Sequence, residues 1–178
     1  MKIAIIGKGN VGSALSRGLM QTGHELVDVA HAQLVVLAVP FSAIDDVLKK
    51  TNLDGKIVID PTNALTADMK LAIGFTTSGA EELQKKAPKA RVVKAFNTVF
   101  AQHMDSGQVK GQQLSLLIAG DDAEAKAVVK KLGDGIGFDT IDAGPLAASR
   151  ELEPLGYLNI RLGYVQKLGA DIGVRIAR

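Results

Sequence analysis

The fold is decided by KIAIIGKGNVGSALSRGL, residues 2–19, in which an apolar run leads through three glycines into a helical pattern. An apolar run of this kind predicts a buried strand. Gly7, Gly9 and Gly12 fit the pattern G-x-G-x-x-G between that strand and the helix. Such glycines serve a sharp turn, the approach of a pyrophosphate to the backbone, and close packing of the helix. The stretch predicts either a dinucleotide-binding turn or a structural turn without a ligand.

The start of the predicted helix favours the dinucleotide. The first N–H groups of a helix have no partner within it, and the helix dipole attracts anions to the same end. The turn also directly follows the first strand of a chain with further strand patterns behind it. We therefore expect Gly7, Gly9, Asn10, Val11 and Gly12 to hold the pyrophosphate of NADP or NAD.

The rest of the chain alternates strand and helix patterns. Apolar runs recur at residues 34–40, 56–60, 91–96 and 114–120. Helix N-caps are indicated by Ser42-x-x-Asp45, Ser78-x-x-Glu81 and Asp121-x-x-Glu124. Nearly unbroken apolar strands are typical of a parallel sheet covered on both faces. We predict an α/β fold with a doubly wound, mostly parallel, Rossmann-like sheet.

The region after the first helix, GHELVDVAHA at residues 23–32, contains the second strand and concerns the adenosine end of the ligand. Asp28 is a candidate for binding a ribose hydroxyl, unless it lies inside the strand with Ala30 at its tip. His31 is a candidate for contacting a 2′-phosphate, or a plain surface residue. Only residues 30–33 separate this strand from the next, so we expect the usual helix and strand of the crossover to be missing and the sheet to be shortened.

The C-terminal region predicts a long helix. Apolar residues recur at helical spacing at Leu152, Leu155, Leu158, Leu162 and Val165. We expect a single NAD(P)-binding domain over residues 1–178, with residues 146–178 as its C-terminal helical segment.

Composition excludes several classes of function. A net charge of +2 gives no reason to expect nucleic acid or an anionic membrane as a partner. The absence of cysteine excludes disulfides, thiolate metal sites and a cysteine nucleophile. The three histidines are scattered, and neither a catalytic triad nor a metal-ligand spacing is present. The sequence opens in a strand pattern rather than a signal peptide, so we expect a cytoplasmic protein.

Polar residues follow two of the predicted strands at their C-terminal ends, where open α/β sheets bind ligands. The first set is DPTN at residues 60–63, which makes Asn63 a candidate for ligand binding or a member of a rigid turn. The second is Asn97, a candidate for fixing a nicotinamide or a hydrogen-bonded loop residue. His103 is a candidate for protonating a flavin-like ring, but is more simply interpreted as a surface residue. Arg150 and Glu153 are most simply interpreted as part of a solvated helix face or a dimer contact.

Six motifs together resemble one family. They are GKGNVG (7–12), GHE (23–25), VVLAVPF (35–41), IVIDPTN (57–63), VVKAFNT (92–98) and DAGPLAASRELE (142–153). Their order is similar to that of the coenzyme F420-dependent NADP oxidoreductases and of the cytosolic oxidoreductase domains of transmembrane metalloreductases. The resemblance implies hydride exchange between a nicotinamide dinucleotide and a deazaflavin or flavin. The sequence departs from the family after the second strand, where it lacks the Ser-Arg pair that holds the 2′-phosphate of NADP. The choice between NAD and NADP therefore stays open.

The resemblance also implies roles for individual residues. Ala38, Val39 and Pro40 match the segment that passes the nicotinamide and its ribose. Asn97 and Thr98 match the loop on the far side of the nicotinamide, where a second redox ring would stack. The C-terminal helix helps to form the homodimer in relatives.

Two functions from different classes are therefore open. The first is an NAD(P)H-dependent oxidoreductase that passes hydride to or from coenzyme F420, FMN or FAD. Such a transfer needs proximity and orientation more than an acid or a base, so we expect no catalytic side chain and no metal. The alternative is a regulator or redox sensor that binds NAD(P) without chemistry. Reduction of a small imine is less supported, because the chain after Asp142 is short for the helical dimer domain of those enzymes.

Overall fold

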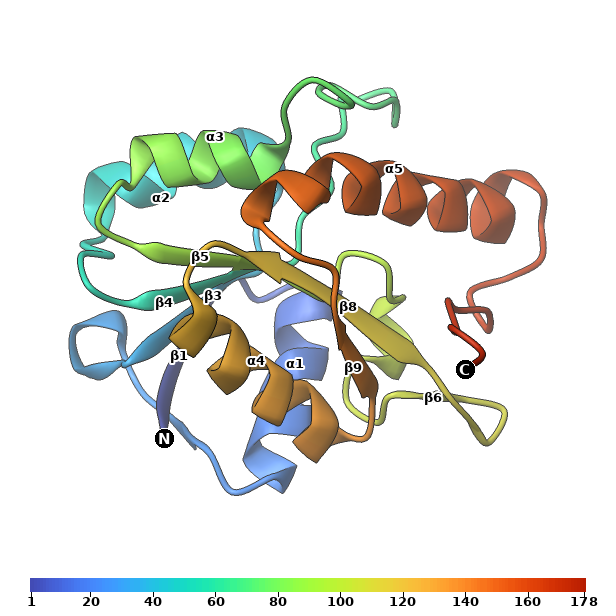
Figure 1. The fold of residues 1–178 in the computed structure, drawn as a ribbon, viewed down its shortest axis with the longest axis horizontal. Helices are drawn as coiled ribbons and strands as arrows, with labels where there is room; N and C mark the ends of the chain where they lie inside the picture. Colours follow the sequence, from blue (N-terminus) through green and yellow to red (C-terminus); the bar gives the residue numbers. More distant parts are fainter.

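The computed structural model describes all residues, 1–178, and its centre is a seven-stranded sheet in the order β2-β1-β3-β4-β5-β8-β9 (Figure 1). The strands of this sheet are β1 (Lys2–Ile6), β2 (Glu25–Leu26), β3 (Leu34–Leu37), β4 (Ile57–Asp60), β5 (Arg91–Lys94), β8 (Ser115–Gly120) and β9 (Asp139–Asp142). A separate hairpin pairs β6 (Gln108–Val109) with β7 (Gln112–Gln113). Strands β2 to β5 run parallel to β1 or to one another, and β8 enters antiparallel to β5. The predicted mostly parallel Rossmann-like sheet is confirmed.

Helices cover both faces of the sheet. The α-helices are α1 (Asn10–Gln21), α2 (Ile44–Lys50), α3 (Gly79–Lys86), α4 (Ala123–Ile136) and α5 (Ser149–Ile160). Short 3₁₀ turns are η1 (Val29–His31), η2 (Phe41–Ala43), η3 (Ala101–His103) and η4 (Leu146–Ala148). Helices α1 and α4 lie on one face, and α2, α3 and α5 lie on the other (Figure 1).

Burial on both faces explains the unbroken apolar strands. In β3, Leu34 and Val36 pack into the core beneath α1 and α4, while Val35 and Leu37 pack into the core beneath α2 and α3. All four are fully buried. A strand covered on both sides has no solvent-facing row, so its sequence does not alternate between apolar and polar residues.

The connection between β2 and β3 is shortened, as expected. Strand β2 ends at Leu26 and β3 begins at Leu34, and only the single turn η1 lies between them. The two strands flank β1 on opposite sides, so this short segment crosses β1 and reverses the strand order there. Asp28 is the N-cap of η1, and the alternative that placed it inside the second strand is wrong.

The C-terminal helix is shorter than predicted. Helix α5 continues into one π-helical segment, Arg161–Val165, and helical structure ends there. Lys167 and Gly169 both have positive φ, and the N–H groups of Leu168 and Gly169 donate to the carbonyls of Leu162 and Gly163. This left-handed turn ends the helix, so residues 166–178 are a non-helical tail rather than part of the helical segment.

One of the three predicted N-caps is confirmed at its residue. Ser78 caps α3, where its hydroxyl accepts a hydrogen bond from the Glu81 N–H. Asp122 caps α4 in place of Asp121, and Ser42 lies inside η2 and caps nothing. No helix of the structure has the length and apolar character needed to cross a membrane.

Candidate functional site

The glycine turn joins β1 to α1 at the C-terminal edge of the sheet, and two of its glycines are required by packing. Gly7 has φ +120°, and a Cβ there would overlap the carbonyl group of Ala38. A Cβ on Gly12 would overlap the carbonyl oxygen of Gly7. Both positions therefore exclude a side chain because of contacts with the protein backbone, whether or not a ligand is bound. They let β1, β3 and α1 meet at this edge.

Gly9 differs from the other two. Its backbone has φ −77° and ψ −169°, which any residue adopts, and no atom lies within 4 Å of the position of a Cβ. It is the N-cap of α1 and provides no capping side chain. The backbone N–H groups of Asn10, Val11 and Gly12 have no hydrogen-bond partner in the protein. The turn thus presents free donors at a helix N-terminus beside open space, which suits a phosphate group.

Two connected pockets lie at this edge. The first, about 280 Å³, is lined by Gly9, Asn10, Val11, Ala38, Val39, Pro40, Phe41, Pro61, Thr62 and Asn63. The second, about 270 Å³, shares Asn10, Val11, Pro61 and Asn63 with the first. It extends to Phe96, Asn97, Thr98, Val99, Phe100, Met104 and the C-terminal helix. Tyr164 is the one ionisable side chain that lines either pocket.

Three residues that line these pockets have buried polar atoms without partners. The hydroxyls of Thr62 and Thr98 and the amide oxygen Oδ1 of Asn97 are buried and accept or donate no hydrogen bond. An unpaired buried polar atom is costly, so such atoms are normally satisfied by water or a ligand. Thr62 lines the first pocket, whereas Asn97 and Thr98 line the second.

The remaining polar atoms of the loops hold them against α5. The Asn97 Nδ2 donates to the Oδ1 of Asn63 at 3.0 Å and to the carbonyl of Leu152 at 2.7 Å. The Asn63 Nδ2 donates in return to the Asn97 carbonyl at 3.0 Å. Gly156 of α5 lies so close to these loops that a Cβ added to it would lie 2.5 Å from the Asn63 Oδ1. Asn63 and Asn97 are thus both pocket residues and bonded loop residues.

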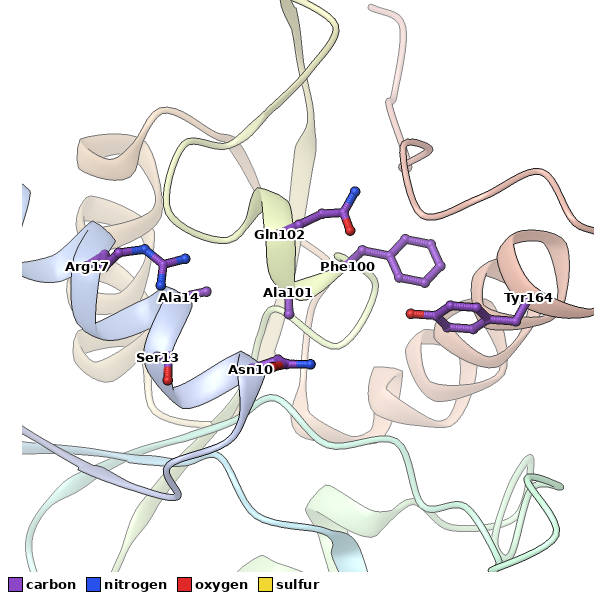
Figure 2. Close-up of a pocket in the computed structure, with 8 residues that line it drawn as sticks. All are labelled: Asn10, Ser13, Ala14, Arg17, Phe100, Ala101, Gln102 and Tyr164. Carbon is purple, nitrogen blue, oxygen red and sulfur yellow. The ribbon is translucent and has the colours of Figure 1, made fainter.

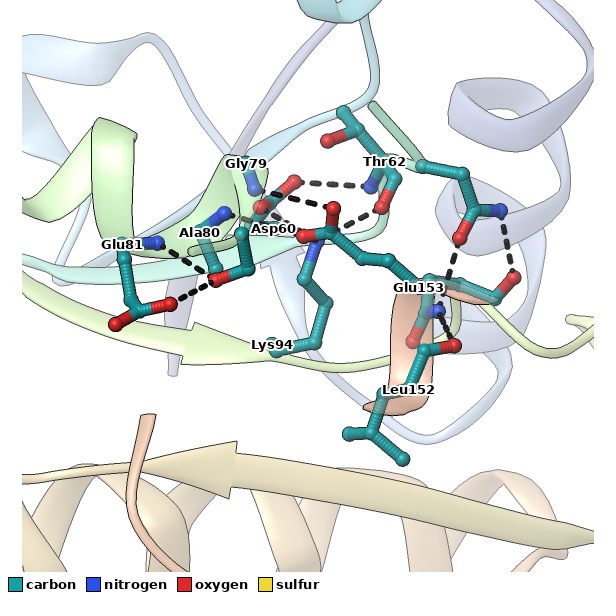
Figure 3. A network of polar contacts seen from close by, with 11 residues as sticks. Asp60, Thr62, Gly79, Ala80, Glu81, Lys94, Leu152 and Glu153 are labelled. Atoms are coloured by element: carbon teal, nitrogen blue, oxygen red, sulfur yellow. Dashed lines mark hydrogen bonds and ion pairs between the residues drawn. The ribbon is translucent and has the colours of Figure 1, made fainter. Parts of the chain in front are cut away.

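A buried ion cluster lies next to these loops (Figure 3). The Lys94 Nζ lies 2.8 Å from the Asp60 Oδ2, 2.8 Å from the Glu153 Oε1, and 2.7 Å from the Thr62 carbonyl. The three side chains are at most 1% exposed. Burial lowers the pKa of Lys94, but the carboxylates of Asp60 and Glu153 more than offset this and hold the pKa above its ordinary value. The Lys94 ammonium therefore stays charged at neutral pH.

Glu153 extends this cluster to a second helix. Its two carboxylate oxygens accept the N–H groups of Gly79 and Ala80 at 3.0 and 3.2 Å, at the N-terminus of α3 (Figure 3). The expectation of a solvated face was therefore wrong for Glu153, which is buried. Arg150 of the same helix pairs with Glu81 of α3 through two contacts of 2.7 and 3.0 Å. This guanidinium lowers the pKa of Glu81.

The candidates for the adenosine end lie apart from the two pockets. The His31 Nδ1 contacts the Asp28 carboxylate at 2.7 Å, and both side chains are about 70% exposed. This hydrogen bond lowers the pKa of Asp28. Neither residue lines either pocket. His103 is not a free surface residue, since its ring is largely covered and its Nε2 lies 3.1 Å from the carbonyl of Ala170.

Sequence reasoning missed the apolar wall of the second pocket. Phe100 and Tyr164 pack edge to face with their ring centroids 5.6 Å apart, and Met104 and Ile160 complete that side. Phe100 and Met104 follow the KAFNT motif directly, so the motif itself was the one available signal. Tyr164 lies far from this motif in the sequence, and no sequence signal marked it as a pocket residue.

Comparison with known proteins identifies the family of the chain. Residues 27–64 match the family model of the coenzyme F420-dependent NADP oxidoreductases. A proposed F420-dependent NADP reductase of Arthrobacter sp. FB24 has a crystal structure that superposes on all of the chain with a TM-score of 0.90. The two proteins are 31% identical, and the superposition covers 100% of each.

Other proteins match parts of the chain. The metalloreductase STEAP3 of Rattus norvegicus is 37% identical over 103 residues, which are 58% of this chain and 20% of that protein. The chain thus spans about a fifth of the length of this relative. An imine reductase of Aspergillus terreus, solved with NADPH4, is 17% identical to this chain. The two structures superpose with a TM-score of 0.65 over 93% of this chain and 63% of the reductase, so they share the fold. With a full-length relative above 30% identity and a matching family model, the chain belongs to the coenzyme F420-dependent NADP oxidoreductases, a family of NAD(P)-dependent oxidoreductases.

Proposed function

We propose that the protein transfers hydride between NADP or NAD and a second redox ring, either a deazaflavin such as coenzyme F420 or a flavin such as FMN or FAD. One observation carries this proposal. Asn10 and Val11, which have free backbone N–H groups, and Asn97, whose buried Oδ1 has no partner, line two pockets that share four residues. A ligand with a phosphate end and an amide-bearing ring has a partner for each end there. Relatives named for coenzyme F420 support the choice of acceptor.

The dinucleotide would lie across the C-terminal edge of the sheet. The N–H groups of Asn10, Val11 and Gly12 would bind the pyrophosphate, and the open space at Gly9 would let it approach the backbone. Residues 38–40 would line the nicotinamide ribose. This placement follows the general rule that open α/β sheets bind ligands where the strand order reverses, which here is at β1.

The second pocket would hold the reacting rings. A bound dihydronicotinamide supplies a hydride to a ring that accepts two electrons. The Asn97 Oδ1 would accept from an amide N–H, because its Nδ2 is already used by Asn63 and Leu152. Phe96, Phe100 and Met104 exclude water from the rings. Neither pocket has a carboxylate, imidazole or amine, so these residues act by orientation rather than by proton transfer.

The proposal is tested with NADPH and NADH carrying deuterium at the nicotinamide C4. We expect the absorbance of the reduced nicotinamide to fall together with that of F420 or FMN, and deuterium to appear in reduced F420. Gly9→Ser should lose this turnover at limiting NADPH, whereas Lys130→Met, a change in an exposed ion pair, should keep it. Binding of the dinucleotide without reduction of any flavin or deazaflavin would instead support the regulator alternative.

We also propose that the protein forms a homodimer through its C-terminal helix. Leu158, Tyr164, Val165 and Leu168 are each at least half exposed and lie on α5, the π-helical segment or the turn that follows. A row of large apolar side chains in water favours association. Light scattering should give a mass twice that of one chain. The variant Leu158→Glu should lower the measured mass toward that of a single chain. A wild-type monomer would contradict the dimer.

A further inference from the structure

A third pocket, next to the site but outside the path of the dinucleotide, has an arginine at one end. It has a volume of about 280 Å³ and lies between α1, η3 and the C-terminal helix (Figure 2). It shares Asn10, Phe100, Ala101 and Tyr164 with the second pocket, so the two are continuous. We propose that this pocket binds the phosphate-bearing side arm of the acceptor, with Arg17 as its anion-binding residue. This inference rests on the proposed function.

One face of α1 forms the floor of the pocket. Asn10, Ser13, Ala14 and Arg17 stand at positions i, i+3, i+4 and i+7, which share one side of a helix. Arg17 therefore lies about 10 Å along the helix from Asn10. Ala14 and Ala101 are small, and they leave room between these two ends. A ring in the second pocket would thus be separated from Arg17 by the length of a flexible side chain.

The polar groups of this pocket offer hydrogen bonds that the protein does not use. The Asn10 carboxamide and the Tyr164 hydroxyl both point into the space between α1 and the C-terminal helix (Figure 2). Neither has a hydrogen-bond partner in the protein, and the same is true of the Ser13 hydroxyl. Gln102 is held at the rim by its bond to the Asp171 carboxylate, 2.6 Å long. A polyol chain would find donors and acceptors along this path.

Arg17 keeps part of its guanidinium available. Its Nε donates to the Asp105 Oδ2 at 2.9 Å, which fixes the side chain. The terminal Nη1 and Nη2 have no partner, and the side chain is 53% exposed. Arginine has five donors in a planar fork, so one carboxylate at Nε leaves the outer edge free for a phosphate. No carboxylate lines the pocket itself.

These features select a class of acceptor. FMN and coenzyme F420 both carry a tricyclic ring on a polyol chain with a phosphate at its far end, a monoester in FMN and a diester to a further acidic arm in F420. Riboflavin has the ring and chain of FMN without the phosphate. The ring suits the aromatic second pocket, the chain suits the floor of α1, and the phosphate suits Arg17. The pocket therefore sets a preference among acceptors rather than the chemistry of the transfer.

The test is equilibrium binding of FMN and riboflavin, followed by flavin fluorescence on protein saturated with NADP⁺, so that it does not depend on turnover. We expect the wild type to bind FMN about tenfold more tightly than riboflavin. Arg17→Leu should remove that preference by weakening FMN alone, and Asp105→Asn should increase it. F420 and its phosphate-free ring and polyol fragment should show the same difference if the deazaflavin is the acceptor.

Arg178→Leu is the matched control. Arg178 also pairs with an aspartate, Asp139, at 2.8 Å, and is 62% exposed, but it lies in the tail away from this pocket. This variant should leave FMN binding unchanged, and Arg17→Leu should bind NADPH as the wild type does. Equal binding of FMN and riboflavin by the wild type, or equal weakening of both by Arg17→Leu, would overturn the subsite and leave the proposed function standing. Binding of NADPH without binding of any flavin or deazaflavin would overturn both.

Discussion

Gly9→Ser is expected to weaken dinucleotide binding by about 100-fold without destabilising the fold. The backbone of Gly9 is in an ordinary extended conformation, and no protein atom lies near the position of its Cβ. A serine there would supply the N-cap that α1 lacks and bind the free N–H groups of Val11 or Gly12, so stability should stay equal or rise by about 0.3 kcal/mol. The same hydroxyl would occupy the space and the donors that the pyrophosphate needs. Calorimetric titration with NADPH and thermal unfolding measure the two effects separately.

Gly7→Ala is the control for this prediction. Its positive φ and the carbonyl group of Ala38 leave no room for a Cβ, so this variant should lose about 1–3 kcal/mol of unfolding free energy. The two glycines of one motif should therefore differ: substitution of Gly9 should weaken dinucleotide binding, and substitution of Gly7 should lower stability. Wild-type affinity in Gly9→Ser would mean that the pyrophosphate lies elsewhere.

Lys94→Met is expected to cause the largest loss of stability, about 3–5 kcal/mol. The substitution removes the cation but leaves the carboxylates of Asp60 and Glu153 buried without a charge partner. Two backbone N–H groups at the start of α3 would still bind Glu153, whereas Asp60 would keep only its existing hydrogen bond from the Thr62 N–H. Urea unfolding of the two proteins gives the difference directly. Glu153→Gln, which keeps the shape of the side chain, should lose less.

The effect of pH follows from the raised pKa of Lys94. A group whose pKa is higher in the folded state stabilises fully below its unfolded value, here 10.5, and loses that contribution as the pH rises through the folded value. The contribution of the Lys94 charge to the stability of the wild type should therefore be constant from neutral pH to about pH 10. Lys130→Met, which breaks the exposed pair with Asp134, should cost about 0.5 kcal/mol or less. An equal small loss in both variants would show that the buried cluster contributes no more than a surface pair.

The parallel core of the fold was predictable from sequence, and its edges were not. Strands β1, β3, β4 and β5 are buried on both faces, and this burial leaves continuous apolar runs that mark them. Strand β9 lies at the edge of the sheet, has Ile141 as its one apolar residue, and was not predicted. The shift of the α4 cap by one residue has a tertiary cause, since Asp121 instead accepts the N–H of Leu146.

The site was predictable where its parts are adjacent in sequence. The glycine turn joins a strand and a helix that follow one another, so spacing alone fixes their geometry. Lys94, Asp60 and Glu153 come from three separate segments, and no local pattern joins them. The one hint was a lysine at the end of an apolar strand, in RVVKAF. Asn97 was predicted to face a ligand or to bond within its loop, and its two ends are found to differ, with Nδ2 bonded and Oδ1 free.

The most direct test of dinucleotide binding at the turn is NMR of the backbone amides during a titration with NADPH. We expect the N–H resonances of Asn10, Val11 and Gly12 to move first and furthest, because these groups have no partner in the free protein. The exposed N–H group of Asp54, which already bonds to a side chain in a distant turn, should stay in place. Saturable binding of NADPH that leaves the three amides unmoved would contradict a pyrophosphate site at this turn.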